Sequence, residues 1–112
     1  GDDVVDIISR DMYPEKHCHT SQSGMYNEMQ KITEKPKITL IGETGTLPDP
    51  KAIHDEKVGW ASFMTWSGGF CLTEEFNTFS KLREVYSSPF AVSTITSSPA
   101  EAVQPLASLA VR

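Results

Sequence analysis

Three side chains that can take part in chemistry stand at the ends of short apolar runs. Glu43 follows KITLIG, Trp66 follows WASFMT, and Tyr13 lies shortly after VVDII. A carboxylate that ends an apolar run is costly to bury unless it is hydrogen-bonded or used. A tyrosine hydroxyl can donate to such a carboxylate and keep it ionised, and an indole offers a flat apolar face to a ligand. Each of the three is therefore a candidate functional residue.

Each candidate also has a structural alternative. Glu43 could cap a loop or pair with a lysine, and Tyr13 could pack over the next helix. Trp66 could seal the end of the core, or its face could stack on the C–H face of a sugar ring. Asp11, which precedes Tyr13 by two positions, is expected to make structural hydrogen bonds. The residue types alone leave these alternatives open.

The elements that must position these side chains are strands separated by helical segments. Three apolar runs have the length of strands: residues 4–8, 37–42 and 60–66. Their near-continuous apolar character is typical of parallel strands covered on both faces. Apolar spacing predicts helices over residues 25–32 and 76–86, and residues 47–58 are expected to form an irregular loop with room for one helical turn. This order predicts successive βα units, whose functional residues gather at the carboxyl ends of the strands.

Alternation along a strand predicts which side chains share a face. Glu43 is expected on the same side of its strand as Ile41. Trp66 is expected on the same side as Met64 and Trp60, although Trp60 stands at the start of the strand and is predicted to belong to the core.

The histidines and cysteines give weaker indications. His17, His19 and His54 could line a site, but loop histidines are most often solvated. His17, Cys18 and His19 are consecutive, yet no second Cys/His cluster follows at ligand spacing, so no metal site is predicted. Cys18 and Cys71 either pair in an oxidising compartment or remain free, half-buried thiols, and free thiols are the expectation.

Composition excludes several classes of protein. The chain has 112 residues and a formal net charge of −5, without the Lys/Arg cluster that a nucleic-acid binder needs. The turn at residues 42–45 lacks the glycine-rich run and the nearby cation of a phosphate site. No apolar run reaches the roughly 18 residues that suggest a membrane span. The chain begins at Gly1 without an initiator Met or a signal peptide, so we expect it to be cut from a longer protein.

The composition changes near residue 92. Residues 1–92 alternate apolar runs with helical patterns, whereas residues 93–112 are rich in Ser, Thr, Pro and Ala. Residues 98–101 have the form of a capping box, and Pro105 would interrupt the helix that follows. We therefore predict one α/β unit over residues 1–92 and a weakly ordered tail, without chemistry, over residues 93–112.

The sequence resembles the end of a glycoside hydrolase family 26 β-mannanase of the kind found in gut Bacteroidetes. The resemblance is carried by GDDVVDIISRDMY (residues 1–13), IGETG (41–45) and GWASFMTWSG (59–68), and it extends over about residues 1–92. It implies an α/β fold in which these stretches are strands six, seven and eight of a (β/α)8 TIM barrel. The tail has no recognised counterpart in the family.

The resemblance also implies an activity and the residues that carry it. Members of the family hydrolyse internal β-1,4-mannosidic bonds with retention, through a glycosyl-enzyme ester and without a cofactor. The family's nucleophile falls on Glu43, the tyrosine that hydrogen-bonds the nucleophile falls on Tyr13, and the platform for the sugar falls on Trp66. The acid/base Glu of the family stands on strand four, and this chain contains no counterpart of strands one to five.

The implied partner is β-mannan or a manno-oligosaccharide, and the implied location is secreted, periplasmic or at the cell surface. With only three strands of the barrel, the chain alone is expected to be inactive and marginally stable or aggregating. Two alternatives stay open: a retaining hydrolase of xylan or β-glucan, and a non-catalytic carbohydrate-binding fragment. A product assay on several glycans distinguishes a mannanase from a hydrolase of xylan or β-glucan. Binding to mannan without hydrolysis would favour the carbohydrate-binding fragment.

Overall fold

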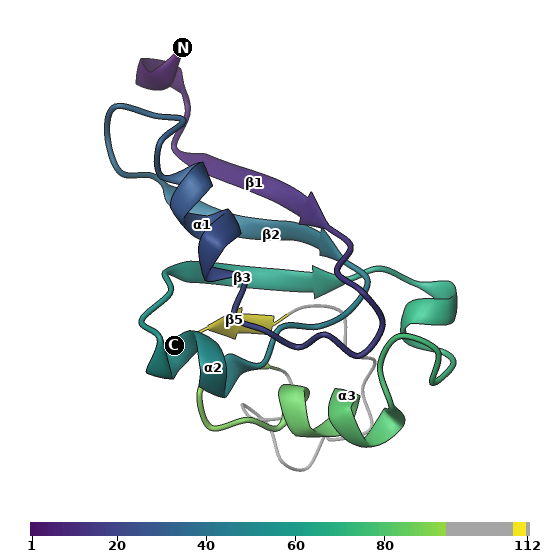
Figure 1. Cartoon of the computed structure of the whole chain (residues 1–112). Coiled ribbons are helices and arrows are strands. Elements are labelled where there is room, and N and C mark those ends of the chain that lie inside the picture. The colour runs from purple at the N-terminus through teal and green to yellow at the C-terminus, as the bar shows by residue number, and fades with distance from the viewer. Residues whose placement is uncertain (94–108, 112) are drawn as a thin grey trace.

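The computed structural model describes residues 1–93 and 109–111, and its centre is a five-stranded sheet (Figure 1). Strands β1 (Ile7–Met12), β2 (Ile38–Thr44) and β3 (Trp60–Thr65) run parallel and lie side by side in chain order. β5 (Leu109–Val111) pairs antiparallel with β3, and β4 (Ala91–Val92) pairs antiparallel with β5. The predicted set of three parallel strands is confirmed, whereas the two short antiparallel strands were not predicted.

Two short helices connect the parallel strands, and a third follows the last of them. They are α1 (Ser23–Met29) between β1 and β2, α2 (Pro50–Asp55) between β2 and β3, and α3 (Phe79–Tyr86) after β3, with 3-10 turns at Asp2–Val4 and Gly68–Phe70. The side chain of Asp49 accepts a hydrogen bond from the Lys51 N–H and caps α2, the one helix within the loop predicted over residues 47–58. Thr78 caps α3 in the same way through the Lys81 N–H, so the helix predicted from residue 76 begins at Phe79.

The first strand begins later than the sequence predicted. Residues 2–4 form a 3-10 turn and pairing with β2 starts at Ile7, so the predicted start at Val4 is wrong. Asp2 fixes this turn, because its carboxylate accepts from the Glu34 N–H at 3.1 Å and its carbonyl accepts from Lys37 Nζ at 2.6 Å. These long-range hydrogen bonds to the segment before β2 outweigh the β-forming tendency of Val4 and Val5.

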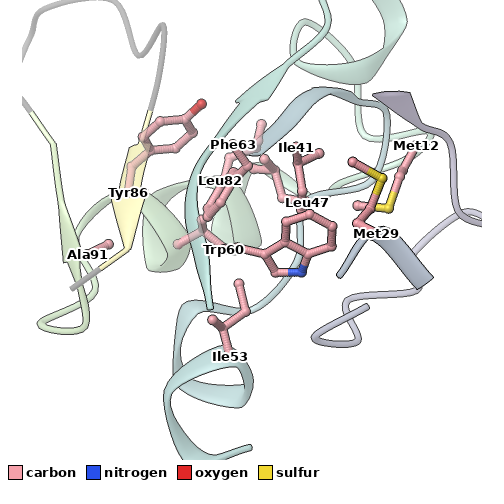
Figure 2. Packing of buried hydrophobic residues seen from close by; sticks show 11 residues of the cluster. Met12, Met29, Ile41, Leu47, Ile53, Trp60, Phe63, Leu82, Tyr86 and Ala91 are labelled. Carbon is pink, nitrogen blue, oxygen red and sulfur yellow. The ribbon is translucent and has the colours of Figure 1, made fainter. Parts of the chain in front are cut away.

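One apolar core joins the three helices to the sheet (Figure 2). Its largest fully buried side chains are Trp60, Tyr86, Phe63, Ile41, Leu47, Ile53 and Val85. The Trp60 indole N–H donates to the Ser21 carbonyl at 3.0 Å, and the Tyr26 ring meets the indole edge-on with the ring centroids 5.1 Å apart. The prediction that Trp60 belongs to the core is confirmed.

An extra residue in β2 changes the face that Glu43 takes. Arg10 of β1 lies opposite Ile41, and Met12 lies opposite Thr44, so β2 has one residue more than its partner over this interval. The pairing of β2 with β3 shows the same extra residue in β2 between Ile41 and Thr44. Ile41 and Thr44 are both buried, which means that Thr44 takes the place on the helix-covered face that alternation assigned to Glu43. The predicted shared face of Glu43 and Ile41 is therefore wrong.

A second irregularity lies in β3. Trp60 and Phe63 are both buried although three positions separate them, and their partners in β2 are only two positions apart. The extra residue in β3 leaves Met64 and Trp66 exposed while Trp60 stays in the core. The prediction that Trp66 and Met64 share a face with Trp60 is wrong for this reason.

The remaining expectations concern membrane-spanning helices, the two cysteines and the C-terminal residues. No helix in the described part is long and apolar enough to cross a membrane. Cys18 and Cys71 are free, half-buried thiols. The predicted capping box at residues 98–101 and Pro105 lie outside the described residues. The division of the chain at residue 92 stays a prediction.

Candidate active site

The loops that follow the three parallel strands gather at one edge of the sheet. In Figure 1 the arrowheads of β1, β2 and β3 point the same way, and the chain after each strand continues on that side. Tyr13 directly follows β1, Glu43 lies next to the end of β2, and Trp66 directly follows β3. The three candidates from the sequence therefore stand on neighbouring strands at the edge where parallel βα proteins hold their functional residues.

A short hydrogen bond joins two of the three candidates. The Tyr13 hydroxyl donates to Glu43 Oε2 with an O···O distance of 2.7 Å. This bond raises the pKa of Tyr13 to about 12, with smaller contributions from burial and from the charges of Glu43 and Asp11. The hydroxyl is protonated at neutral pH, as a tyrosine is even at its ordinary pKa, and the raised pKa extends its role as a donor to the carboxylate to more alkaline pH. The predicted pairing of Glu43 with a tyrosine is favoured over its pairing with a lysine.

Two phenylalanines of the loop after β3 support Tyr13. The Phe70 ring packs at a tilt against the Tyr13 ring with centroids 5.5 Å apart, and Phe76 packs against Phe70 at 4.4 Å. Lys16 Nζ lies 5.3 Å from the centroid of Phe76 and forms an ion pair with Glu75 at 2.6 Å. Because Tyr13 is half-exposed, these ring contacts rather than deep burial fix its orientation.

Two glycines on either side of Glu43 and Thr44 allow close approach, Gly42 within β2 and Gly45 directly after it. A Cβ on Gly45 would lie 2.5 Å from Phe70 Cε1 and 3.0 Å from Tyr13 Cδ1. A Cβ on Gly42 would lie 2.7 Å from Asp11 Oδ1. The absence of a side chain at Gly45 therefore lets the Phe70 and Tyr13 rings reach the backbone next to Glu43, and at Gly42 it lets the Asp11 carboxylate do so.

Trp66 is tied to the same turn through its backbone. Its N–H donates to the Thr44 carbonyl at 2.9 Å, one residue beyond Glu43. The indole is 45% exposed, so much of the ring is open to a ligand. Within the described residues Trp66 is thus not part of the buried core, and its role as a platform stays a prediction.

The three histidines contact residues other than Tyr13 and Glu43. His19 Nδ1 and the Leu47 carbonyl oxygen are 2.7 Å apart, and the His17 N–H donates to the Phe76 carbonyl at 3.0 Å. His54 belongs to α2 and packs on Phe90 with ring centroids 4.4 Å apart. His17 and His19 thus connect loops of this edge, and His54 packs elsewhere.

Two further residues at this edge were not predicted from the sequence. Phe70, which supports Tyr13, and Asn77, which is fully buried, stand in a polar loop whose pattern gave no indication of either role. Asn77 contacts Gly45 and Leu47, about thirty positions earlier in the chain, and such long-range partners leave no periodic pattern in a sequence.

Comparison with known proteins shows to which family the chain belongs. The family model described as Glycosyl hydrolase family 26 matches residues 1–95. Mannan endo-1,4-beta-mannosidase A of Piromyces sp is 31% identical over 84 residues, which are 75% of this chain and 14% of the Piromyces protein. Mannan endo-1,4-beta-mannosidase of Thermothelomyces thermophilus is 29% identical over 92 residues, or 82% of this chain and 19% of that protein. The chain thus spans less than a fifth of the length of these relatives.

Solved structures agree with this match. The Podospora anserina GH26-CBM35 beta-(1,4)-mannanase superposes with a TM-score of 0.72 at 31% identity, over 80% of this chain and 20% of that one. A beta-mannanase from a symbiotic protist of the termite Reticulitermes speratus, solved with a gluco-manno-oligosaccharide, gives a TM-score of 0.68 at 29% identity, over 80% of this chain and 27% of that one. The expected likeness to Bacteroidetes enzymes stays a prediction. The chain belongs to glycosyl hydrolase family 26, and its parallel strands have the fold of part of a (β/α)8 barrel.

Proposed function

We propose that the protein carrying this chain hydrolyses internal β-1,4-mannosidic bonds in mannan with retention, and that Glu43 is its nucleophile. The observation that carries the proposal is the 2.7 Å hydrogen bond from Tyr13 to Glu43 at the carboxyl ends of two adjacent parallel strands. The relatives of the chain are mannan endo-1,4-beta-mannosidases, which supports mannan as the substrate.

Glu43 would attack the anomeric carbon and form a glycosyl-enzyme ester, which water then hydrolyses. The attacking carboxylate must be ionised and correctly aimed. The hydroxyl of Tyr13 serves both needs, because it stays protonated and its bond fixes one carboxylate oxygen. We assign the attack on the sugar to the other oxygen, Oε1.

Retention requires a second carboxyl group about 5–5.5 Å from the first, which protonates the leaving oxygen. We assign this role to no residue of the chain. Asp11 stands near the pair, but it lies against Gly42 on the strand beside the nucleophile. The acid/base Glu is expected on strand four of the complete barrel, and the chain alone is expected to be inactive for lack of it.

Trp66 is proposed as the platform for the sugar that is cleaved. Its half-exposed indole follows β3, the strand next to the one that carries Glu43. The C–H face of a mannose ring can stack on such a surface while its hydroxyls bind polar groups nearby. The proposed reaction needs no cofactor, and the proposed location of the protein is secreted, periplasmic or at the cell surface.

The test uses the complete enzyme, in which this chain is joined to the other barrel strands. Glu43→Gln keeps the size of the side chain and its bond from Tyr13, and it should abolish nearly all turnover of mannan with an unchanged unfolding midpoint. Assays on mannan, glucomannan, xylan and mixed-linkage glucan then compare substrates. Near-normal turnover in the variant would refute the nucleophile, faster cleavage of xylan or β-glucan would refute the substrate, and binding without hydrolysis by the unaltered enzyme would favour a carbohydrate-binding role.

A further inference from the structure

The bond between Tyr13 and Glu43 requires that separate loops keep a fixed relation to each other. Tyr13 begins the loop after β1, and Glu43 precedes the turn after β2. The ring that supports Tyr13, Phe70, belongs to the loop after β3. A residue that ties the second loop to the third therefore influences the geometry of the nucleophile without touching it.

Asn77 makes this connection. Its Nδ2 donates to the Gly45 carbonyl and to the Phe70 carbonyl, each at 2.8 Å, and its Oδ1 accepts from the Leu47 N–H at 2.9 Å. The side chain is fully buried, so water cannot replace these bonds. One amide thus satisfies backbone groups of both loops, with both its donors used.

The two carbonyls that Asn77 holds belong to residues in direct contact. Gly45 is the residue over which the Phe70 ring lies, with so little space that a Cβ would be 2.5 Å from the ring. Phe70 in turn packs against Tyr13. Asn77 therefore fixes the ring and the backbone beneath it together, and a shift of either would move the Tyr13 ring.

We propose that Asn77 is a positioning residue, which acts through Phe70 to hold Tyr13 where it donates to Glu43. The inference rests on the proposed function, because it assumes that this bond serves catalysis. A positioning role differs from a general structural role in one respect, because the effect of Asn77 on turnover must then pass through the Tyr13 hydroxyl. Removing that hydroxyl should then remove most of the effect.

The experiment is a double-mutant cycle in the complete enzyme, with kcat and KM measured on a soluble mannan. Asn77→Asp keeps the size of the side chain but places a carboxylate oxygen against the two carbonyls. It should lower kcat on the order of 10- to 100-fold, with a smaller change in KM, as expected for a misplaced catalytic group. In a Tyr13→Phe background the same change should lower kcat by no more than about twofold.

Thr39→Val is the matched control. Thr39 is also fully buried, and it accepts from Gln30 at 2.9 Å, but it lies near the other end of β2. This substitution should lower the unfolding midpoint and change kcat equally, within about twofold, in both backgrounds. Phe70→Leu provides a second route if Asn77→Asp does not fold, because it leaves every bond of Asn77 intact and should show the same dependence on Tyr13.

The outcomes separate the two proposals. If Tyr13→Phe alone lowers kcat and Asn77→Asp or Phe70→Leu lowers it further by its full factor, the positioning role is refuted while the proposed function stands. If Tyr13→Phe leaves kcat unchanged, the role of the tyrosine in the proposed function fails, and the inference fails with it. Loss of the Asn77 effect in the Tyr13→Phe background supports the inference.

Discussion

Replacement of Gly45 by alanine tests the packing that holds the candidate site. The φ angle of Gly45 is not positive, so the backbone itself accepts alanine at this position. The added Cβ would however meet Phe70 Cε1 at 2.5 Å, Phe70 Cδ1 at 2.8 Å and Tyr13 Cδ1 at 3.0 Å. Carbon atoms in contact prefer about 3.5–4 Å, so the Phe70 ring must move by roughly 1 Å.

The Phe70 ring cannot make this movement freely. It is packed between Tyr13 at 5.5 Å and Phe76 at 4.4 Å, measured between ring centroids. Overpacking of this kind costs about 1–3 kcal/mol, and the reduced freedom of the unfolded chain returns about 0.4–1 kcal/mol. We expect Gly45→Ala to destabilise the complete enzyme by about 1–2 kcal/mol.

Activity should fall by more than stability explains. If the displaced ring moves Tyr13 by a similar distance, the 2.7 Å bond to Glu43 opens beyond hydrogen-bonding range. A misplacement of about 1 Å near a reacting group costs on the order of 100-fold, and we expect a loss in kcat of about 10- to 100-fold in folded protein.

The assay compares kcat on soluble mannan with the free energy of unfolding in urea, at a temperature where each variant is folded. Gly24→Ala is the control, because nothing lies within 4 Å of a Cβ on this glycine of α1. It should raise stability by up to about 1 kcal/mol and leave kcat unchanged. A Gly45→Ala enzyme with normal kcat and normal stability would refute the reasoning.

Three further predictions follow from other contacts. Because the pKa of Tyr13 is raised from 10.0 to about 12, the stability linked to it is complete below about pH 10 and is lost as the pH rises toward 12. The pKa values of Lys51, Lys81 and Tyr86 are also raised and contribute equally in both proteins, so the unfolding free energy of wild type should fall more steeply over this range than that of Tyr13→Phe; equal slopes would refute the linkage. Trp66→Ala should raise KM for manno-oligosaccharides roughly tenfold through loss of stacking, and unchanged kinetics would count against a platform. Trp60→Phe removes the buried bond to Ser21 and should cost about 1–3 kcal/mol in urea unfolding at constant kcat; a lower kcat would show that the core reaches the site.

The sequence was sufficient to predict the three strands that position the candidate site and the edge of the sheet at which it lies. Continuous apolar runs closed by turn residues indicated three parallel strands, and parallel strands present their carboxyl ends at one edge. Tyr13, Glu43 and Trp66 stand at the ends of those runs, so their placement on neighbouring strands followed from order alone. The family resemblance carried by the same stretches agrees with the family model over residues 1–95.

The tertiary structure decided which face of the sheet Glu43 takes and which residues hold the candidate site in place. Alternation assigned Glu43 to the side of Ile41, but one extra residue in β2 turns it away, and the register of a strand depends on its partners rather than on its own sequence. Asn77 lies 32 positions from Gly45, and Phe70 lies far along the chain from Tyr13. Contacts between loops at such separation arise only when the sheet brings the strand ends together, which is why no local pattern could predict them.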